Sequence, residues 1–151
     1  MEIRKAKVTD AGAIHALIEY YAQLDRMLFR SLASIYENLQ TFSIAELNNQ
    51  IVGCCALQVI WNDLAEIKSL AVDVGHRQKG VGKSLIKAAL AEACALGLKR
   101  VFALTMEPEF FENLGFKVID KKTLPMKVWS DCARCPKQDH CDETAVIIEL
   151  S

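Results

Sequence analysis

Residues 64–84 read LAEIKSLAVDVGHRQKGVGKS, which joins three patterns in one short stretch. Residues 64–72 predict a strand, and residues 73–80 predict a polar, glycine-bearing loop. A long helix is predicted from about Val81 to Leu96. The first backbone N–H groups of such a helix have no partner within it, and the helix dipole adds positive potential there. The end of the loop is therefore a candidate anion site.

The loop also carries the charge that a phosphate group would need. Arg77, Lys79 and Lys83 are basic, and the loop glycines let the backbone approach a bulky anion closely. The glycines lack the spacing of a dinucleotide fingerprint, and His76 stands where a Walker loop requires glycine. We expect a pyrophosphate cradle, with a glycine-rich turn and solvated lysines as the alternative.

Two helices and a three-stranded meander are predicted upstream of this stretch. A strand at residues 2–7 leads to Thr9 or Asp10, either of which can cap the first helix. Strands at residues 41–47 and 51–61 follow the helices and continue through the Asn62-Asp63 turn into residues 64–72, and Asn48-Asn49-Gln50 is a hairpin turn. The buried helix faces are Ile14, Leu17, Ile18 and Tyr21, then Leu32, Ile35, Tyr36 and Leu39.

Shorter elements are predicted downstream. Gly97 is placed to end the long helix, and Gly115 to end a short one that begins at Pro108 and runs through Leu114. Residues 124–143 are expected to be irregular with a possible short helix. The remaining strands are predicted at residues 100–105, 116–120 and 145–150. The fold class is α/β, or α+β layered, with a mixed sheet and flanking helices.

Composition supports a single domain over residues 1–151. The chain has 52% hydrophobic and 25% charged residues and a net charge of −1, without the basic excess of a nucleic-acid binder. It shows no apolar run of membrane-spanning length and no signal peptide, so we expect a cytoplasmic protein without a membrane partner. The six cysteines are expected to be mostly free thiols.

Two motifs together resemble a known superfamily. Arg77-x-x-Gly80-x-Gly82, preceded by the strand at 66–72, resembles the acetyl-CoA site of the GNAT acetyltransferases. The later Phe110-Phe111-Glu112-Asn113-Leu114-Gly115-Phe116 is similar to the closing helix–strand element of that superfamily. The resemblance covers nearly the whole chain and implies a mixed, mostly antiparallel central sheet with acetyl-CoA as co-substrate.

The resemblance also implies how acetyl-CoA is held. The strand at 64–72 is expected to leave its neighbour at a bulge, where backbone groups hold the pantetheine and polarise the acetyl carbonyl. The implied cofactor-binding residues are Leu70, Ala71, Val72, Arg77, Gln78, Lys79, Gly80, Val81, Gly82, Lys83, Ser84 and Phe111.

A closer resemblance is to short, stand-alone bacterial N-acetylglutamate synthases. It rests on residues 53–57, 61–67 and 105–111, and on Arg30-Ser31-Leu32 leading into Tyr36-Glu37. Those enzymes acetylate L-glutamate in the first step of arginine biosynthesis. Another small amine or a protein N-terminus as acceptor, and a non-catalytic acetyl-CoA-binding module, are the alternatives. A small-molecule substrate is expected, and a homodimer stays open.

Glu66 matches the place where some GNAT members carry a general base. Glu66, Lys68 and Leu70 are expected to share one strand face, since side chains alternate along a strand. A partly buried glutamate would have a raised pKa and could accept the proton of the amine. The alternative is a surface glutamate paired with Lys68.

The donor of a proton to the leaving thiolate is not evident. Many GNAT members have a tyrosine four residues before the glycine of the closing element, where this chain has Phe111. None of Tyr20, Tyr21 and Tyr36 matches that place. The resemblance thus implies a thiolate that leaves without that tyrosine or takes its proton from water, with Phe111 as a packing residue.

Glutamate as acceptor would require cations for two carboxylates. Arg30 lies between the first two helices, where GNAT members often build the acceptor site, and Lys68 shares the strand of Glu66. Arg26 and Lys127 are weaker candidates. For each of these residues, a solvated surface cation is the alternative.

The last cysteines form an unusual group. Cys132 and Cys135 form a C-x-x-C motif, and His140-Cys141 follows at short spacing. A zinc site, a disulfide and free structural thiols are all compatible with this pattern. We favour free thiols and predict no metal ligand, because a second C-x-x-C is missing and adjacent His140 and Cys141 would struggle to bind one ion.

Overall fold

The computed structural model describes residues 1–124 and 143–150 as one sheet with helices on both faces. Seven strands lie in the order β1-β2-β3-β4-β5-β7-β6, and only the pair β4–β5 is parallel. The strands are β1 (Glu2–Lys5), β2 (Phe42–Leu47), β3 (Gln50–Trp61), β4 (Leu64–Val72), β5 (Arg100–Thr105), β6 (Lys117–Ile119) and β7 (Thr144–Glu149). The predicted mixed, mostly antiparallel sheet is confirmed.

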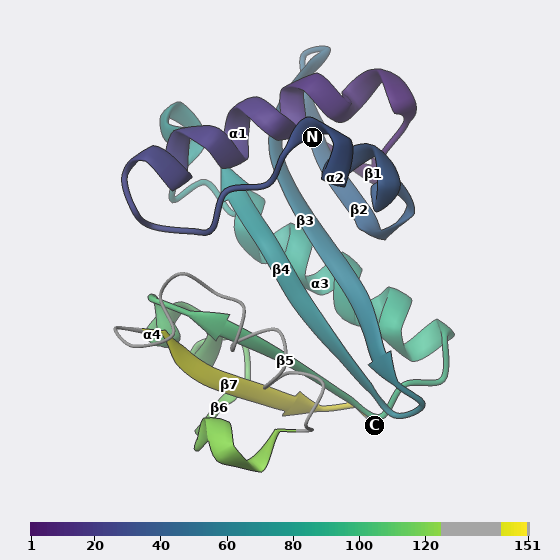
Figure 1. Cartoon of the computed structure of the whole chain (residues 1–151), viewed down its shortest axis with the longest axis vertical. Helices are drawn as coiled ribbons and strands as arrows, with labels where there is room; N and C mark the ends of the chain where they lie inside the picture. Colours follow the sequence, from purple (N-terminus) through teal and green to yellow (C-terminus); the bar gives the residue numbers. More distant parts are fainter. Residues whose placement is uncertain (125–142, 151) are drawn as a thin grey trace.

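The helices cover the two faces unequally. Helices α1 (Ala11–Gln23) and α2 (Leu32–Glu37) lie on the face nearest the viewer in Figure 1, and α3 (Val81–Ala95) crosses behind the sheet. The short helix α4 (Pro108–Glu112) lies beside β5 and β7. Separate apolar clusters fill the two sides, one around Ile14, Ile18 and Phe42 and one around Leu85, Ile86 and Val101.

Local sequence signals placed most boundaries correctly. Asn48 and Asn49 both adopt positive φ in the β2–β3 turn, as their short polar side chains allow. Gly97 and Gly115 end α3 and α4 with φ of +85° and +100°. Several boundaries differ by one or two residues: β1 ends at Lys5 rather than residue 7, α2 at Glu37, two residues before Leu39, and α4 at Glu112 rather than Leu114. No described helix is long and apolar enough to cross a membrane.

The prediction that the Asp10 side chain caps the first helix by a hydrogen bond is wrong. Asp10 occupies the N-cap position of α1, but its carboxylate makes no cap hydrogen bond to that helix. It accepts the Lys7 backbone N–H at 2.7 Å and the Arg4 guanidinium at 2.8 Å instead. The carboxylate therefore ties the start of α1 to strand β1.

A β-bulge interrupts strand β4. Cys54 of β3 pairs with Ala71, but Ala56 pairs with Lys68, so β4 holds an extra residue between these pairs. Ser69, within this bulge, has a φ of +54°. The parallel register between β4 and β5 runs from Leu64↔Arg100 to Ile67↔Ala103 and stops there. The two strands therefore separate just before the bulge, as predicted.

We predict that Asp10→Asn lowers the free energy of unfolding by about 1–3 kcal/mol at pH 7, because it breaks a charge-assisted bond to Arg4. The hydrogen bond from Arg4 lowers the pKa of Asp10 below its ordinary value of 3.8. A lowered folded-state pKa contributes stability above the unfolded value, and that contribution disappears as the pH falls through the folded value.

Urea unfolding of both proteins at pH 7 and pH 3 measures this effect. The difference between them should be full at pH 7 and smaller at pH 3. Asp63→Asn is the control, because the Asp63–Arg100 pair is exposed on both sides and should contribute little. Equal stability of the wild type and Asp10→Asn at pH 7 would contradict the assignment.

Candidate active site

A cavity of about 1030 Å³ opens where β4 and β5 separate. Its walls come from the α1–α2 connection, the end of β4, the loop before α3, and the segment from β5 into α4. The predicted site residues in its lining are Arg26, Arg30, Glu66, Lys68, Leu70, Val72, Arg77, Gln78, Gly80, Val81, Gly82, Lys83 and Phe111. Residues distant in the sequence thus meet in one place.

Three of the predicted cofactor-binding residues lie outside the lining. The Ala71 side chain is 2% exposed and belongs to the apolar cluster under α1 and α2. Lys79 is exposed, and Ser84 lies further along α3, where its N–H already bonds the Gly80 carbonyl.

The loop before α3 has a backbone conformation that favours glycine at position 80. Gly80 is the N-cap of α3 with a φ of +82°, and a Cβ there would meet no atom within 4 Å. Gln78 also adopts positive φ, at 63°. The first residues of α3, Val81 to Lys83, line the cavity. The unpaired backbone N–H groups of a helix start favour an anion there.

Packing gives Gly82 a further reason to be glycine, beside the predicted approach of a phosphate. A Cβ at Gly82 would lie 3.3 Å from Cζ of Phe110 and 3.7 Å from a methyl carbon of Val72. The missing side chain lets the Phe110 ring pack directly against α3, so the helix turn, β4 and α4 meet without a gap. The sequence suggested only close approach of a phosphate at this position.

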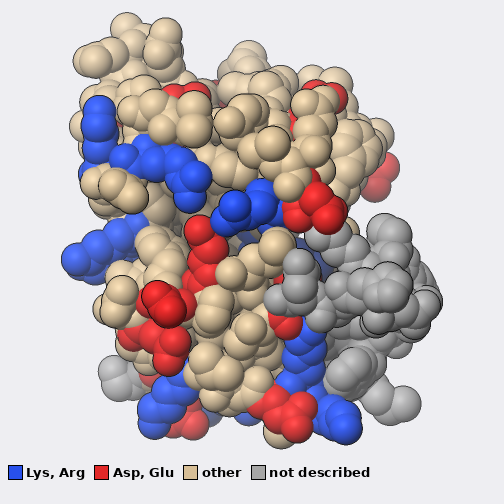
Figure 2. Space-filling view, turned by 90° about the vertical axis from the view of Figure 1, so that its left-hand side faces the viewer, with Lys and Arg blue, Asp and Glu red and all other residues tan. Residues whose placement is uncertain are grey.

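Charged side chains of both signs surround the opening of the cavity. One carboxylate oxygen of Glu107 lies 3.4 Å from the Arg26 guanidinium and 3.6 Å from that of Arg77. All three side chains are about half exposed, so each pair contributes little to stability. Figure 2 shows basic and acidic side chains gathered around a hollow on this face of the molecule. Arg77 is therefore only loosely held.

The bulge changes which side chains of β4 face the acceptor side of the cavity. Glu66 and Lys68 line the cavity as predicted, but Leu70 packs with Ile67 in the cluster on the α3 face. The expectation that Glu66, Lys68 and Leu70 share one face is wrong, because the extra residue, Ser69, shifts the alternation.

Glu66 is a buried acid beside a base. Its residue exposure is 7%, and one carboxylate oxygen lies 3.6 Å from Nζ of Lys68, whose side chain is 30% exposed. The alternative of a surface glutamate is therefore wrong, while its pairing with Lys68 is present. A buried carboxylate in a cavity wall is placed to accept a proton from a bound molecule.

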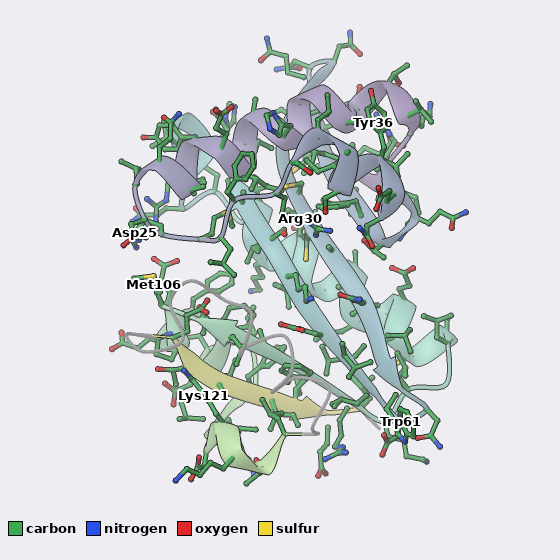
Figure 3. All side chains as sticks on the ribbon, viewed as in Figure 1. Asp25, Arg30, Tyr36, Trp61, Met106 and Lys121 are labelled. Atoms are coloured by element: carbon green, nitrogen blue, oxygen red, sulfur yellow. The ribbon has the colours of Figure 1, made fainter. Side chains whose placement is uncertain are left out.

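Arg30 is a half-buried cation held by neutral groups. Its guanidinium lies within 3.4 Å of the Ser34 hydroxyl, within 3.3 Å of the Ser69 hydroxyl, and 5.2 Å from the centre of the Phe42 ring. Burial lowers the pKa of Arg30. Figure 3 shows Arg30 below the α1–α2 connection, over β3 and β4. In the described part of the chain, no carboxylate lies within ion-pair distance of it.

The cavity also contains residues that the sequence did not single out as site residues. Tyr21 donates its hydroxyl hydrogen bond to the carbonyl oxygen of Val72. Glu107 and Phe110 also line the cavity, and the sequence indicates them only as members of the stretches 105–111 and 110–116. Met27, Leu28 and Phe29 line the cavity as well. This apolar run is a signal for the site in the sequence, because apolar side chains in a loop between helices often line a ligand site.

The described cysteines lie in different surroundings. Burial raises the pKa of Cys54 to about 12 and also raises the pKa of Cys55, whereas Cys94 is exposed. Among residues 1–124 and 143–150, no group of His, Cys, Asp and Glu could hold a metal ion. The predicted candidates Cys132, Cys135, His140 and Cys141, and also Lys127, lie outside the described residues.

The residues present fit the expected acetyl-CoA. The cavity combines a helix start with open space at Gly80, two exposed cations at Arg77 and Lys83, and a β4 edge that β5 no longer covers. These would hold a diphosphate at one end and a chain of amide groups along the strand. The chemistry that acetyl-CoA supplies is an acetyl thioester.

Comparisons with known proteins agree with this geometry. A sequence model described as the acetyltransferase (GNAT) family matches residues 10–116. An uncharacterized N-acetyltransferase from Chlorobaculum tepidum is 41% identical over 98% of this chain and 96% of its own length. An amino-acid acetyltransferase from Mycobacterium tuberculosis is 38% identical over 87% of this chain and 77% of its own length.

Solved structures show the same fold. A Mycobacterium tuberculosis protein in complex with CoA and NLQ is 31% identical, covers 100% of both chains and has a TM-score of 0.89. N-acetylglutamate synthase from Neisseria gonorrhoeae, complexed with coenzyme A and N-acetyl-glutamate, is 28% identical with a TM-score of 0.91. The match covers 99% of this chain and 35% of the Neisseria chain, so the two proteins differ greatly in length.

We predict that Gly82→Val raises the KM for acetyl-CoA about tenfold or more, a loss of about 1.4 kcal/mol of binding. The added branch would push against Phe110 and narrow the cavity at the start of α3. Steady-state kinetics with varied acetyl-CoA measure the effect. Gly12→Val is the control, because a Cβ at Gly12 in α1 would meet nothing within 4 Å. An unchanged KM in a folded Gly82→Val protein would contradict the prediction that acetyl-CoA binds against the start of α3.

Proposed function

Because the chain belongs to the acetyltransferase (GNAT) family and uses acetyl-CoA, we propose that it acetylates the α-amino group of L-glutamate. The product would be N-acetyl-L-glutamate, made in the first step of arginine biosynthesis. The observation that carries the proposal is the half-buried Arg30 in the cavity wall, with neutral partners and no carboxylate within reach in the described chain.

Arg30 is suited to a carboxylate of the acceptor. A guanidinium that has already lost part of its hydration gains strongly from a bidentate carboxylate, which restores two charge-assisted hydrogen bonds. Its contacts with the hydroxyls of Ser34 and Ser69 hold its orientation without neutralising its charge. Lys68, on the same wall, provides a second cation for the other carboxylate.

Glu66 is suited to receive the proton that the amine loses. The acceptor nitrogen must be neutral when it attacks and sheds a proton as the amide forms. Glu66 is buried in the cavity wall, where a carboxylate can take that proton directly or through a water molecule. The Lys68 ammonium lies 3.6 Å from one oxygen of this carboxylate.

The backbone of β4 is suited to polarise the thioester. Beyond Ile67 the strand edge is no longer paired with β5, and the bulge at Ser69 turns successive peptide groups toward the cavity. Backbone N–H groups near Leu70 and Val72 would donate to the thioester oxygen and to pantetheine amides. Arg77, Lys83 and the first turn of α3 would bind the diphosphate.

Relatives support glutamate over other amines. The Mycobacterium tuberculosis relative is named an amino-acid acetyltransferase, and the Neisseria structure contains coenzyme A and N-acetyl-glutamate. An acceptor other than glutamate is the second candidate, favoured by the wide opening of the cavity beside the apolar residues Leu28 and Phe29. That opening could admit a longer amine or a peptide end.

We predict that reduced protein, mixed with acetyl-CoA and a panel of amines, forms N-acetylglutamate in preference to other products. The panel contains L-glutamate, L-glutamine, L-aspartate, ornithine, polyamines and short peptides. Product mass is measured, because the six cysteines would disturb a thiol-reagent assay for CoA. Preferential acetylation of another amine would retain the enzyme and its co-substrate but refute glutamate as acceptor.

We further predict that substitutions of Arg30 and Glu66 have separable effects. Arg30→Ala should raise the KM for glutamate by about 10–100-fold while the KM for acetyl-CoA is unchanged, because a charge-assisted bond to the acceptor is lost. Glu66→Gln should lower kcat by about 100-fold or more, because it removes the proton acceptor.

Steady-state kinetics with each substrate varied measure both effects, and Arg100→Ala is the matched control. Arg100 is an exposed arginine at the start of β5, outside the cavity lining, so its removal should alter neither constant. If Arg30→Ala weakened acetyl-CoA and glutamate equally, Arg30 would not be an acceptor residue.

A further inference from the structure

The leaving thiolate lacks its expected proton donor at Phe111. The Phe111 ring is 4% exposed and lies edge-on to Phe110 and Phe116, with ring centres 5.3 Å and 5.1 Å away. It is a packing residue that fixes α4 against the sheet, and it has no hydroxyl. Among residues 1–124 and 143–150, a donor would have to come from another wall of the cavity.

Tyr21 provides a hydroxyl on the opposite wall. All three tyrosines of the chain lie in described segments, and only Tyr21 lines the cavity. Tyr20 and Tyr36 are 46% and 49% exposed on the outer surface. The Tyr21 hydroxyl donates to the carbonyl oxygen of Val72, on the stretch of β4 that no longer pairs with β5.

The position along β4 is appropriate for the sulfur. Leu70, at the bulge, and Val72 are two residues apart, which is about 6.6 Å along a strand. A phenol anchored at Val72 thus lies on the same stretch of β4 as the backbone groups proposed to polarise the thioester. The Arg77 guanidinium, 6.0 Å from the centre of the Tyr21 ring, lies on the diphosphate side.

The other proton donors of the cavity are less suitable. The His76 ring bonds Asp73 at 2.8 Å and belongs to the loop before α3, near the expected diphosphate. The Lys68 ammonium is paired with Glu66, and the Ser69 hydroxyl accepts from Arg30. Burial raises the pKa of Tyr21, so the phenol carries its proton at neutral pH and any transfer must be driven by the charge of the leaving thiolate.

We propose that Tyr21 is a catalytic residue, the general acid that protonates the leaving CoA thiolate. The amine nitrogen attacks the acetyl carbon, a C–N bond forms, and the C–S bond breaks with its electron pair on sulfur. Tyr21 gives its hydroxyl proton to that sulfur, and Glu66 takes the proton that the nitrogen loses. Solvent then returns the proton from Glu66 to the Tyr21 phenolate, so that charge and atoms balance.

The competing explanation is that Tyr21 only positions β4 through the Val72 carbonyl. In that case Tyr21→Phe would disturb the strand that holds the pantetheine, and binding of acetyl-CoA would weaken. A general acid, by contrast, contributes to the chemical step and leaves binding of acetyl-CoA unchanged. A tyrosine at the Phe111 position could replace a missing acid but could not replace a missing bond to Val72.

The test compares Tyr21→Phe, Tyr20→Phe, and the double variant Tyr21→Phe with Phe111→Tyr. For each, kcat is measured by product mass with whichever amine the wild type acetylates, and the Kd for acetyl-CoA by calorimetry without acceptor. Because the wild-type product is identified first, a wrong acceptor is seen as a different product and leaves this comparison intact.

We expect Tyr21→Phe to lower kcat by about 100-fold with an unchanged Kd for acetyl-CoA, and the double variant to regain most of that loss. Tyr20→Phe should equal the wild type, because Tyr20 lies outside the cavity. The proposal is overturned if Tyr21→Phe keeps its kcat. It is also overturned if the Kd rises and Phe111→Tyr restores nothing.

Discussion

The extra residue in β4 is the constraint on which the site depends. Without Ser69 at positive φ, β4 would continue its ladder beside β5, and the sheet would close over the place where the cavity opens. The bulge also turns Leu70 to the α3 face, while Glu66 and Lys68 line the cavity on the other side. One inserted residue thus gives the strand a separate task on each side of the sheet.

Charged side chains that are partly buried in the cavity wall interact more strongly with a bound ligand than exposed ones would. Arg30 is half buried and Glu66 is buried in the cavity wall, with the Ser69 hydroxyl beside Arg30 and the Lys68 ammonium beside Glu66. A bound molecule that supplies the missing opposite charge gains more here than on an exposed surface. Breaking the exposed Glu107–Arg77 pair, by comparison, costs little free energy.

Most of the fold could be predicted from the sequence, since apolar periodicity, the Asn-Asn turn and the glycines at helix ends are local signals. The bulge was implied only by resemblance, and its effect on Leu70 was missed, because side-chain alternation assumes a regular strand. Tyr21 was set aside for not matching a motif position, although it reaches the cavity from α1. Which walls face each other is decided by tertiary packing, which a motif in one segment does not encode.

The place of β7 in the sheet bears on how the protein is made. Strand β7 lies between β5 and β6, although it follows both along the chain. During synthesis β4 is therefore the only strand that β5 can pair with until residues 144–149 have been made. Parallel and long-range pairings form late because they require closure of long loops. The strand β5, which contributes to the cavity wall, thus gains its second sheet neighbour only after β7 has been made.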